Sequence, residues 1–328
     1  MRGDATIAPA RDARTHRGAS RVLKGGTAVS PRALALRSAE DIAGIAAAGA
    51  IVAAALDAAR SACAEGVATA ELDRIVHDSI RGAGAEPVFL GYRGGGDPAA
   101  SVRPPFPAST CISVNEELVH GVPGSRVLQR GDVVSIDAGA RFDGWCADSA
   151  VTVAVGVVDR EYARMVETAG YMLDEAIRAI RPGLRWSAIA RMMESIAVDS
   201  GFTIAVDFVG HGIGRELHEP PQVPCSVYAS FLEGGDFTLR PGMVLAIEPM
   251  IVCEPPVRNE RGELRNPAVT LAADGWTVVL DSGARSCHVE HTVAVTRDGA
   301  QVLTSREPTA HPLQETGPRR ARAAQLAC

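Results

Sequence analysis

Residues 133–155 read VVSIDAGARFDGWCADSAVTVAV, and this stretch decides the fold more than any other part of the chain. Two runs rich in β-branched residues flank the dipeptide Asp143-Gly144, which favours a tight hairpin turn. The expected hairpin carries Asp137 and Asp148 nearly opposite each other. Because like charges that face each other destabilise a sheet, a cation between the two carboxylates is the simplest explanation. Two solvent-facing turn aspartates are the alternative, but the apolar residues before Asp137 favour a buried strand.

Three more acidic or imidazole side chains lie beside Gly, Pro or β-branched residues farther along the chain. His211 lies between glycines after an expected strand, Glu248 interrupts an apolar run that ends at a proline, and Glu290 lies within an expected strand. Four carboxylates and one imidazole form a ligand set for two hard or borderline divalent cations. A buried ion pair is the alternative for each glutamate. The candidate metal ligands are Asp137, Asp148, His211, Glu248 and Glu290.

The order of expected elements predicts an α+β protein. Helices are expected after a capping box that begins at Ser38 and after Thr69, and two longer helices after the hairpin. Apolar runs then predict a strand-rich region, and the polar segment 258–273 is expected to be a surface loop. This order predicts two similar α+β halves with the site between them. The two later helices are expected at 160–180 and 187–199, and the later strands at 203–208, 243–252, 276–281 and 287–296.

Composition limits the class of protein. With 328 residues and 46% hydrophobic content, the chain can bury a full core. A net charge of −6 argues against a nucleic-acid surface over the whole protein. The seven cysteines are widely spread without a C-x-x-C pair, which fits a reduced cytosol. The most apolar run, 42–56, is too short to span a membrane, and the N-terminus has no apolar signal core. A cytoplasmic location is therefore expected.

Seven short motifs in a fixed order resemble type I methionine aminopeptidases, which belong to the creatinase-like, pita-bread metallopeptidases. The resemblance covers about residues 38–304 and implies a pita-bread fold of two pseudo-symmetric halves around a dinuclear metal site. The tails 1–37 and 305–328 lie outside it and are expected to be a flexible basic extension and a disordered segment. The motifs are CISVNEELVHGVP at 111–123, SID at 135–137, CADS at 146–149, GHGIG at 210–214, HEPPQ at 218–222, IEPM at 247–250 and EHT at 290–292.

The resemblance implies a role for each matching residue. Asp137 would bind one metal, while Asp148 and Glu290 would bridge two divalent ions (Co, Mn, Fe, Zn or Ni). His211 and Glu248 would complete the second metal site. A dinuclear site activates a water molecule, and Glu248 can carry the proton of that water to the leaving nitrogen. The two remaining imidazoles, which would contact the substrate and the tetrahedral intermediate, are His120 and His218; a structural hydrogen bond is the alternative for each.

The resemblance also places a methionine pocket beside the metals. Three positions depart from the family pattern, because Phe89 replaces a small residue, Leu217 an aromatic one and His288 a glutamine. The segments 93–105 and 253–275 are longer than usual. These departures affect the pocket and not the set of metal ligands. The pocket would consist of Phe89, Tyr92, Phe106, Cys111, Leu217 and Trp276.

The expected activity is removal of the N-terminal methionine from nascent proteins whose second residue is small. One alternative is a Xaa-Pro dipeptidase or aminopeptidase P of the same fold, and another is a non-catalytic pita-bread binding protein. A serine hydrolase is disfavoured because the sequence has no G-x-S-x-G motif. The expected partner is a nascent polypeptide N-terminus, with ribosome contact through the basic tails. A monomer is expected, with no membrane and no sequence-specific nucleic acid as partners.

Overall fold

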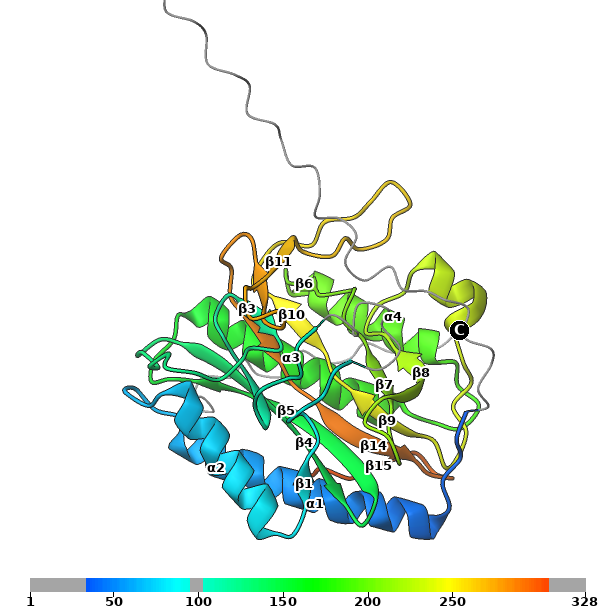
Figure 1. Ribbon diagram of the computed structural model, residues 1–328. Coiled ribbons are helices and arrows are strands. Elements are labelled where there is room, and N and C mark those ends of the chain that lie inside the picture. The colour runs from blue at the N-terminus through cyan, green and yellow to red at the C-terminus, as the bar shows by residue number, and fades with distance from the viewer. Residues whose placement is uncertain (1–33, 95–102, 307–328) are drawn as a thin grey trace, which may run out of the picture.

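The computed structural model describes residues 34–94 and 103–306, which form two α+β halves. In the first half, two helices pack beside a four-stranded antiparallel sheet. Figure 1 shows these blue and cyan helices along one side of the long green hairpin β4–β5. The elements of this half are α1 (Ala39–Ala62), α2 (Thr69–Gly82), β1 (Glu86–Pro87), β2 (Thr110–Val114), β4 (Val133–Phe142) and β5 (Trp145–Ala154).

The second half repeats this plan with another helix pair and its own strands. The helices α3 (Arg160–Ala179) and α4 (Trp186–Asp199) pack against each other and against the sheet β13–β10–β6. A five-stranded sheet, β15–β14–β9–β7–β8, continues from it. The strands are β6 (Thr203–Ile204), β7 (Gly210–Gly212), β8 (Glu219–Val223), β9 (Val244–Ile247), β10 (Met250–Val252), β13 (Ser286–His288), β14 (His291–Val295) and β15 (Ala300–Val302).

A fourth sheet connects the two halves. The strand β3 (Glu117–Val119) pairs with β12 (Val278–Leu280), and β12 pairs with β11 (Val269–Leu271). A π-helical turn, η2 (Phe231–Gly235), lies between β8 and β9. Because β3 precedes the hairpin while β11 and β12 come late in the chain, this sheet fixes the first half to the second.

Each half has its own apolar core. Ile45, Leu72 and Ile136 lie in the first core, under α1 and α2, while Trp186 and Ile247 lie in the second. Full burial of such a side chain contributes about 1.5–3 kcal/mol relative to exposure. The strands of the two halves meet between these cores, where β5 contacts β14 and β4 contacts β13. The expected α+β fold in two halves is therefore confirmed.

The expected helices are confirmed, and so is the capping box at the first of them. The backbone N–H of Asp41 donates to Ser38 Oγ at 3.1 Å, and the backbone N–H of Ser38 donates to Asp41 Oδ2 at 2.9 Å. The backbone hydrogen bond lowers the pKa of Asp41 below its usual value. Two N–H groups at the helix start are therefore satisfied reciprocally.

Two strands were wrongly expected to be continuous. The run 243–252 divides into β9 and β10 at Glu248-Pro249, and the run 287–296 divides into β13 and β14 at Val289-Glu290. At each break the chain leaves one sheet and enters another. Glu290 therefore does not share one pleated face with its neighbours two residues away. The expected polar loop 258–273 also contains the strand β11.

The hairpin pairs its residues differently from the expected arrangement, in which Asp137 and Asp148 were nearly opposite each other. Asp143 and Gly144 form the two-residue turn with φ of 48° and 76°, so Phe142 pairs with Trp145. This turn sets the pairing along the whole hairpin. Asp137 lies opposite Ala150 and Asp148 lies opposite Gly139. The two aspartates are therefore diagonal neighbours on one face of the sheet and do not face each other directly.

The helix α1 is longer than the apolar run that the sequence indicated. The helix has 24 residues, and its most apolar 18-residue window has a mean hydropathy of 2.0, which is enough to cross a membrane by length and composition. One face of the helix packs inside the protein, where Ile45, Val52 and Leu56 are fully buried. Buried core helices pass the same test, so the length of α1 is weak evidence for a membrane.

The domain boundaries expected at 38 and 304 stay predictions. Just outside them, the backbone N–H of Arg37 donates to Gly242 O at 2.7 Å, and the guanidinium of Arg306 donates to Ser149 Oγ at 2.7 Å. The expectations for the tails beyond 34–306 and for residues 95–102 of the long loop lie outside the described residues.

Candidate metal centre

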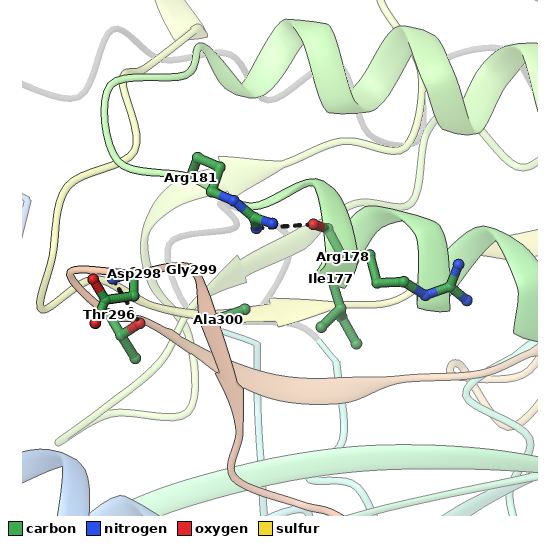
Figure 2. A pocket seen from close by; sticks show the side chains of 7 residues that line it. All are labelled: Ile177, Arg178, Arg181, Thr296, Asp298, Gly299 and Ala300. Atoms are coloured by element: carbon green, nitrogen blue, oxygen red, sulfur yellow. Dashed lines mark hydrogen bonds between the residues drawn. The ribbon is translucent and has the colours of Figure 1, made fainter. Parts of the chain in front are cut away.

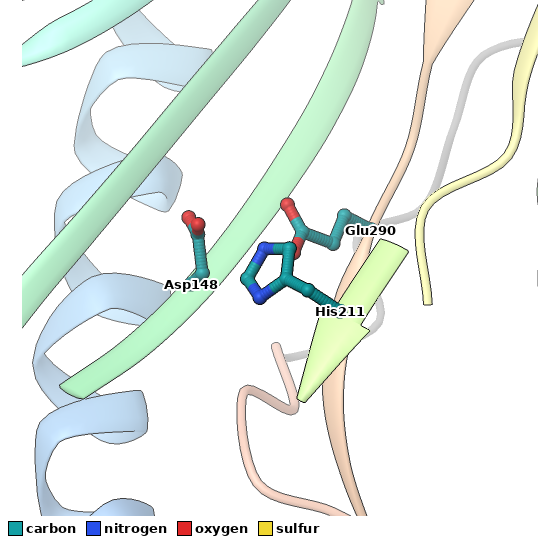
Figure 3. Close-up of side chains that lie close together, drawn as sticks. All are labelled: Asp148, His211 and Glu290. Atoms are coloured by element: carbon teal, nitrogen blue, oxygen red, sulfur yellow. The ribbon is translucent and has the colours of Figure 1, made fainter. Parts of the chain in front are cut away.

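Three segments that are distant in sequence bring three donor groups together. Asp148 comes from β5, His211 from β7 and Glu290 from the break between β13 and β14. One donor atom of each residue lies within 4.8 Å of the other two, and all three side chains are buried. Figure 3 shows the two carboxylates on opposite sides of the imidazole ring. This separation is compatible with a shared cation.

Glu248 and Asp137 complete the expected set. Glu248 lies in the break between β9 and β10, where its Oε1 is 3.6 Å from His211 Nε2. Asp137 lies on β4, where burial and then the negative charges of Asp148 and Glu248 raise its pKa. The structure therefore brings all five predicted ligands to one place. Their role in metal binding stays a prediction.

The electrostatics of this cluster favour a cation. Burial, followed by the charge of a neighbouring carboxylate, holds the pKa of Asp137 and of Glu290 well above the usual range. Burial raises the pKa of Asp148 and of Glu248 to about 8. Among the described residues, one oxygen of Asp137, Asp148 and Glu290 is buried without a hydrogen-bond partner. Such an oxygen costs about 1–3 kcal/mol, which a divalent cation would offset. The five residues therefore fit a metal.

The position of His211 depends on the glycines beside it. A Cβ on Gly210 would lie 2.3 Å from Ala246 O, and one on Gly212 would lie 2.2 Å from Pro220 O. Only glycine lets these three backbones approach so closely. His211 Nδ1 lies 2.9 Å from Gly212 O, which is an acceptor, so Nδ1 carries the proton and Nε2 is left to bind a metal. His211 lies in the strand β7, which pairs with β8 on one side and with β9 on the other.

Three residues that the sequence did not identify hold the ligands in place. Thr292 Oγ1 accepts a hydrogen bond from the backbone N–H of Asp148 at 3.0 Å and donates to its carbonyl at 2.7 Å. Ser149 Oγ donates to the carbonyl of Glu290 at 2.6 Å and accepts from Arg306. Thr292 and Ser149 lie inside the motifs, whereas Arg306 lies in the expected tail and carries no local signal.

The two predicted non-ligand imidazoles lie beside the donor cluster. His120 follows β3 with a left-handed φ of 57°, and its ring is 6.5 Å from that of Trp276. His218 precedes β8, with its ring centre 4.2 Å from that of His211. Its Nδ1 lies 2.5 Å from Tyr92 Oη. The contact of these imidazoles with a substrate stays a prediction.

The expected pocket residues gather next to these imidazoles. Tyr92 lies 5.3 Å from the ring of His218 and 6.4 Å from that of Trp276, and Phe106 packs edge-on against Trp276 at 5.3 Å. Burial, followed by the charge of Asp137, holds the pKa of Cys111 well above its usual value, so the thiol stays neutral. Tyr92, Phe106, Cys111 and Trp276 therefore form a mostly apolar wall beside the two imidazoles. The other expected pocket residues, Phe89 and Leu217, are buried in the same apolar cluster.

An open hollow of about 350 Å³ shares no residue with the metal cluster (Figure 2). It lies between the end of α3 and the turn before β15. Arg181 donates to the carbonyl of Ile180 at 2.6 Å, and Arg178 pairs with Asp174 at 3.6 Å. The guanidinium groups of this hollow therefore already have partners, and the carboxylate cluster is the stronger candidate site.

Removing divalent cations with a chelator is expected to make stability fall as pH rises. Asp148 and Glu248 have folded pKa values near 8, above the usual carboxyl values near 4. The stability linked to their protonation is present below about pH 4 and is lost as pH rises toward 8. The buried histidines of the site have lowered pKa values and act in the opposite direction below about pH 6.5, so the melting temperature of the metal-free protein should decrease from about pH 7 to pH 8. Adding Mn²⁺ or Co²⁺ should raise it more at pH 8 than at pH 5.

The matched control is the Asp148→Asn/Glu248→Gln double variant, in which two of these titrating groups are gone. Its melting temperature should vary less with pH in the chelator. A wild-type melting temperature that stays constant or increases over this range would contradict the expected coupling.

Comparison with known proteins places the chain among metallopeptidases. Residues 43–297 match the model of metallopeptidase family M24. Methionine aminopeptidase 1 of Bacillus subtilis is 40% identical over 239 residues, which cover 73% of this chain and 86% of that protein. The crystal structure of methionine aminopeptidase from Thermotoga maritima superposes with a TM-score of 0.73 and 34% identity, covering 84% of this chain and all of that one.

The structure is also similar, at lower sequence identity, to a second class of peptidase. The prolidase of Pyrococcus horikoshii superposes with a TM-score of 0.59 at 23% identity, covering 83% of this chain and 64% of that one. At this identity the match shows the common fold alone. The expected pita-bread fold is confirmed by these likenesses together with the two-half arrangement.

Proposed function

The chain belongs to metallopeptidase family M24, and from this premise we propose that it is a methionine aminopeptidase that removes methionine from polypeptide N-termini. One observation carries the proposal: four carboxylates and an imidazole converge beside an aromatic wall. The ligand cluster suits hydrolysis, and the adjacent wall suits an unbranched apolar side chain such as that of methionine. The chain is a metal-dependent hydrolase.

The five donors would hold two divalent cations, whose identity the donor set leaves open among Mn, Fe, Co, Ni and Zn. The residues that would hold this pair are Asp137, Asp148, His211, Glu248 and Glu290. The chemistry that such cations supply when bound is Lewis acidity, which activates water and polarises a carbonyl. The side chains of the protein would transfer the proton and donate hydrogen bonds to the oxyanion.

Glu248 would carry the proton of the reaction. Its carboxylate lies within the donor cluster, 3.6 Å from His211 Nε2, where it can exchange a proton with a water molecule or a substrate. Glu248 accepts a proton from the attacking water and returns it to the nitrogen that leaves when the peptide bond breaks. His120 and His218 donate hydrogen bonds to the oxyanion that develops on the former carbonyl oxygen.

Peptides that differ in their first two residues test this function. Met-Ala-Ser is expected to release free methionine only with a divalent cation present, and methionine followed by a large residue is expected to react slowly. Ala-Pro peptides are expected to stay intact. A preference for the proline bond would support the Xaa-Pro peptidase alternative instead. Failure to bind Co, Mn, Fe or Zn at saturating concentrations would support a non-catalytic binding protein.

We further propose that the substrates are nascent chains and that the protein acts in the cytoplasm as a monomer. The six cysteines within the described residues are free thiols, which suits a reducing compartment. Ribosome contact through the basic tails belongs to the same proposal. Co-sedimentation of full-length and tail-less protein with ribosomes would test it.

A further inference from the structure

The side chain of His288 lies at the metal centre but has no role in the mechanism above. It is 4% exposed, and among the described residues its Nε2 is buried without a hydrogen-bond partner. This Nε2 lies 3.5 Å from Glu248 Oε2, whereas His211 Nε2 lies 3.6 Å from Glu248 Oε1. The carboxylate of Glu248 therefore lies between two imidazoles, and each imidazole faces a different oxygen.

The backbone of His288 is held firmly by both strands of the hairpin. Its N–H lies 3.1 Å from both Ser135 Oγ and Thr152 Oγ1, and its carbonyl accepts from Thr152 Oγ1 at 2.6 Å. Across the sheet β13–β10 it pairs with Met250, two residues after Glu248. These contacts fix the Cα of His288 relative to the break that carries Glu248, so the imidazole reaches the carboxylate from a rigid base.

The arrangement favours a hydrogen-bond donor over a further metal ligand. A neutral imidazole carries one N–H, and a buried N–H is normally paired. The carboxylate of Glu248 is the acceptor that Nε2 faces. A small rotation of this carboxylate converts the 3.5 Å approach into a hydrogen bond.

We propose that His288 is a positioning residue that donates its Nε2–H to Glu248 Oε2 and thereby assigns different tasks to the two oxygens of that carboxylate. Oε1, on the side of His211, is left to bind metal, and Oε2 is kept available to accept and return the proton. The proton transfer by Oε2 rests on the proposed function, whereas the hydrogen bond from His288 does not. Without the donor, Glu248 can turn and use both oxygens for the metal.

Three substitutions separate the hydrogen bond from packing. His288→Gln keeps an amide N–H at a similar reach, His288→Asn shortens that reach, and His288→Leu removes the donor. His77→Leu is the control, because His77 bonds to Ser109 Oγ at 2.8 Å on α2, in the outer helix pair. Each protein is titrated with Co²⁺ to obtain the number of bound ions and the visible absorption bands, and kcat and KM are measured with Met-Ala-Ser.

We expect His288→Leu and His288→Asn to bind as many Co²⁺ ions as the wild type, with shifted absorption bands. Their kcat should fall about 10–100-fold with little change in KM, as is usual for residues that orient a ligand. His288→Gln should keep the wild-type bands and most of kcat, and so should His77→Leu.

Wild-type bands and kcat in His288→Asn would overturn the proposal, and so would equal behaviour of the Gln and Asn variants. Loss of one bound Co²⁺ in these variants would make His288 a ligand and would also overturn it. Melting temperatures show whether the His288→Leu variant folds. If it does not fold, the Co²⁺ spectra and kcat of His288→Gln and His288→Asn test the proposal. The Co²⁺ spectra need no substrate, so they test His288 even if the wild type fails to release methionine.

Discussion

Glu248→Gln is expected to lower kcat about 10²–10⁴-fold at saturating metal, the range for loss of a positioned general acid–base group. A glutamine has nearly the same size and keeps one carbonyl oxygen as a ligand, but its amide cannot accept and return a proton. The carboxylate that it replaces lies within the donor cluster, 3.6 Å from His211 Nε2. Methionine release from Met-Ala-Ser, measured with excess Co²⁺ or Mn²⁺, gives kcat and KM separately. The loss should fall mainly on kcat.

Metal content distinguishes this result from simple loss of a ligand. The variant should bind the wild-type number of ions at high metal concentration, with weaker affinity. Glu233→Gln is the control, because Glu233 is an exposed carboxylate on η2. Activity of the Glu248 variant near the wild-type level would mean that another group carries the proton.

The five candidate donors could be identified from the sequence because each interrupts an apolar or glycine-rich run. A charge such as that of Glu248 among Val, Leu, Ala and Ile is costly to bury, so it indicates a partner even when the partner is unknown. The local rules for capping at Ser38 and for the Asp143-Gly144 turn also predicted the structure correctly. These signals act over a few residues, and they are independent of the tertiary fold.

The remaining features depend on pairings between distant segments. The division of 243–252 and 287–296 into two strands each follows from the geometry of two sheets, and the hydrophobic pattern is the same in a continuous strand. Arg306 contacts Ser149 and Ala150 from the end of the described chain, and nothing in its neighbours predicts this. The sequence identified His288 as unusual, but its contact with Glu248 required the register of β13 with β10.

His120→Asn is expected to lower kcat about 10²–10³-fold, the range for loss of one donor to a developing oxyanion. Asparagine is the appropriate replacement because His120 adopts a left-handed φ of 57°. Asn tolerates this conformation better than Ala, and Asn115 already adopts a φ of 58° in this chain. The variant therefore removes the imidazole with little backbone strain. The assay is again kcat for Met-Ala-Ser at saturating metal.

The number of bound ions decides between a donor and a ligand at His120. Because the ring of His120 lies 6.5 Å from Trp276 on the pocket side, its loss should leave the wild-type number of ions bound, with an unchanged Co²⁺ spectrum. His77→Asn is the control, because it makes the same substitution at a distant imidazole, and it should keep the wild-type kcat. If His120→Asn loses an ion together with activity, His120 is a metal ligand, and the oxyanion would then depend on His218 alone among the imidazoles.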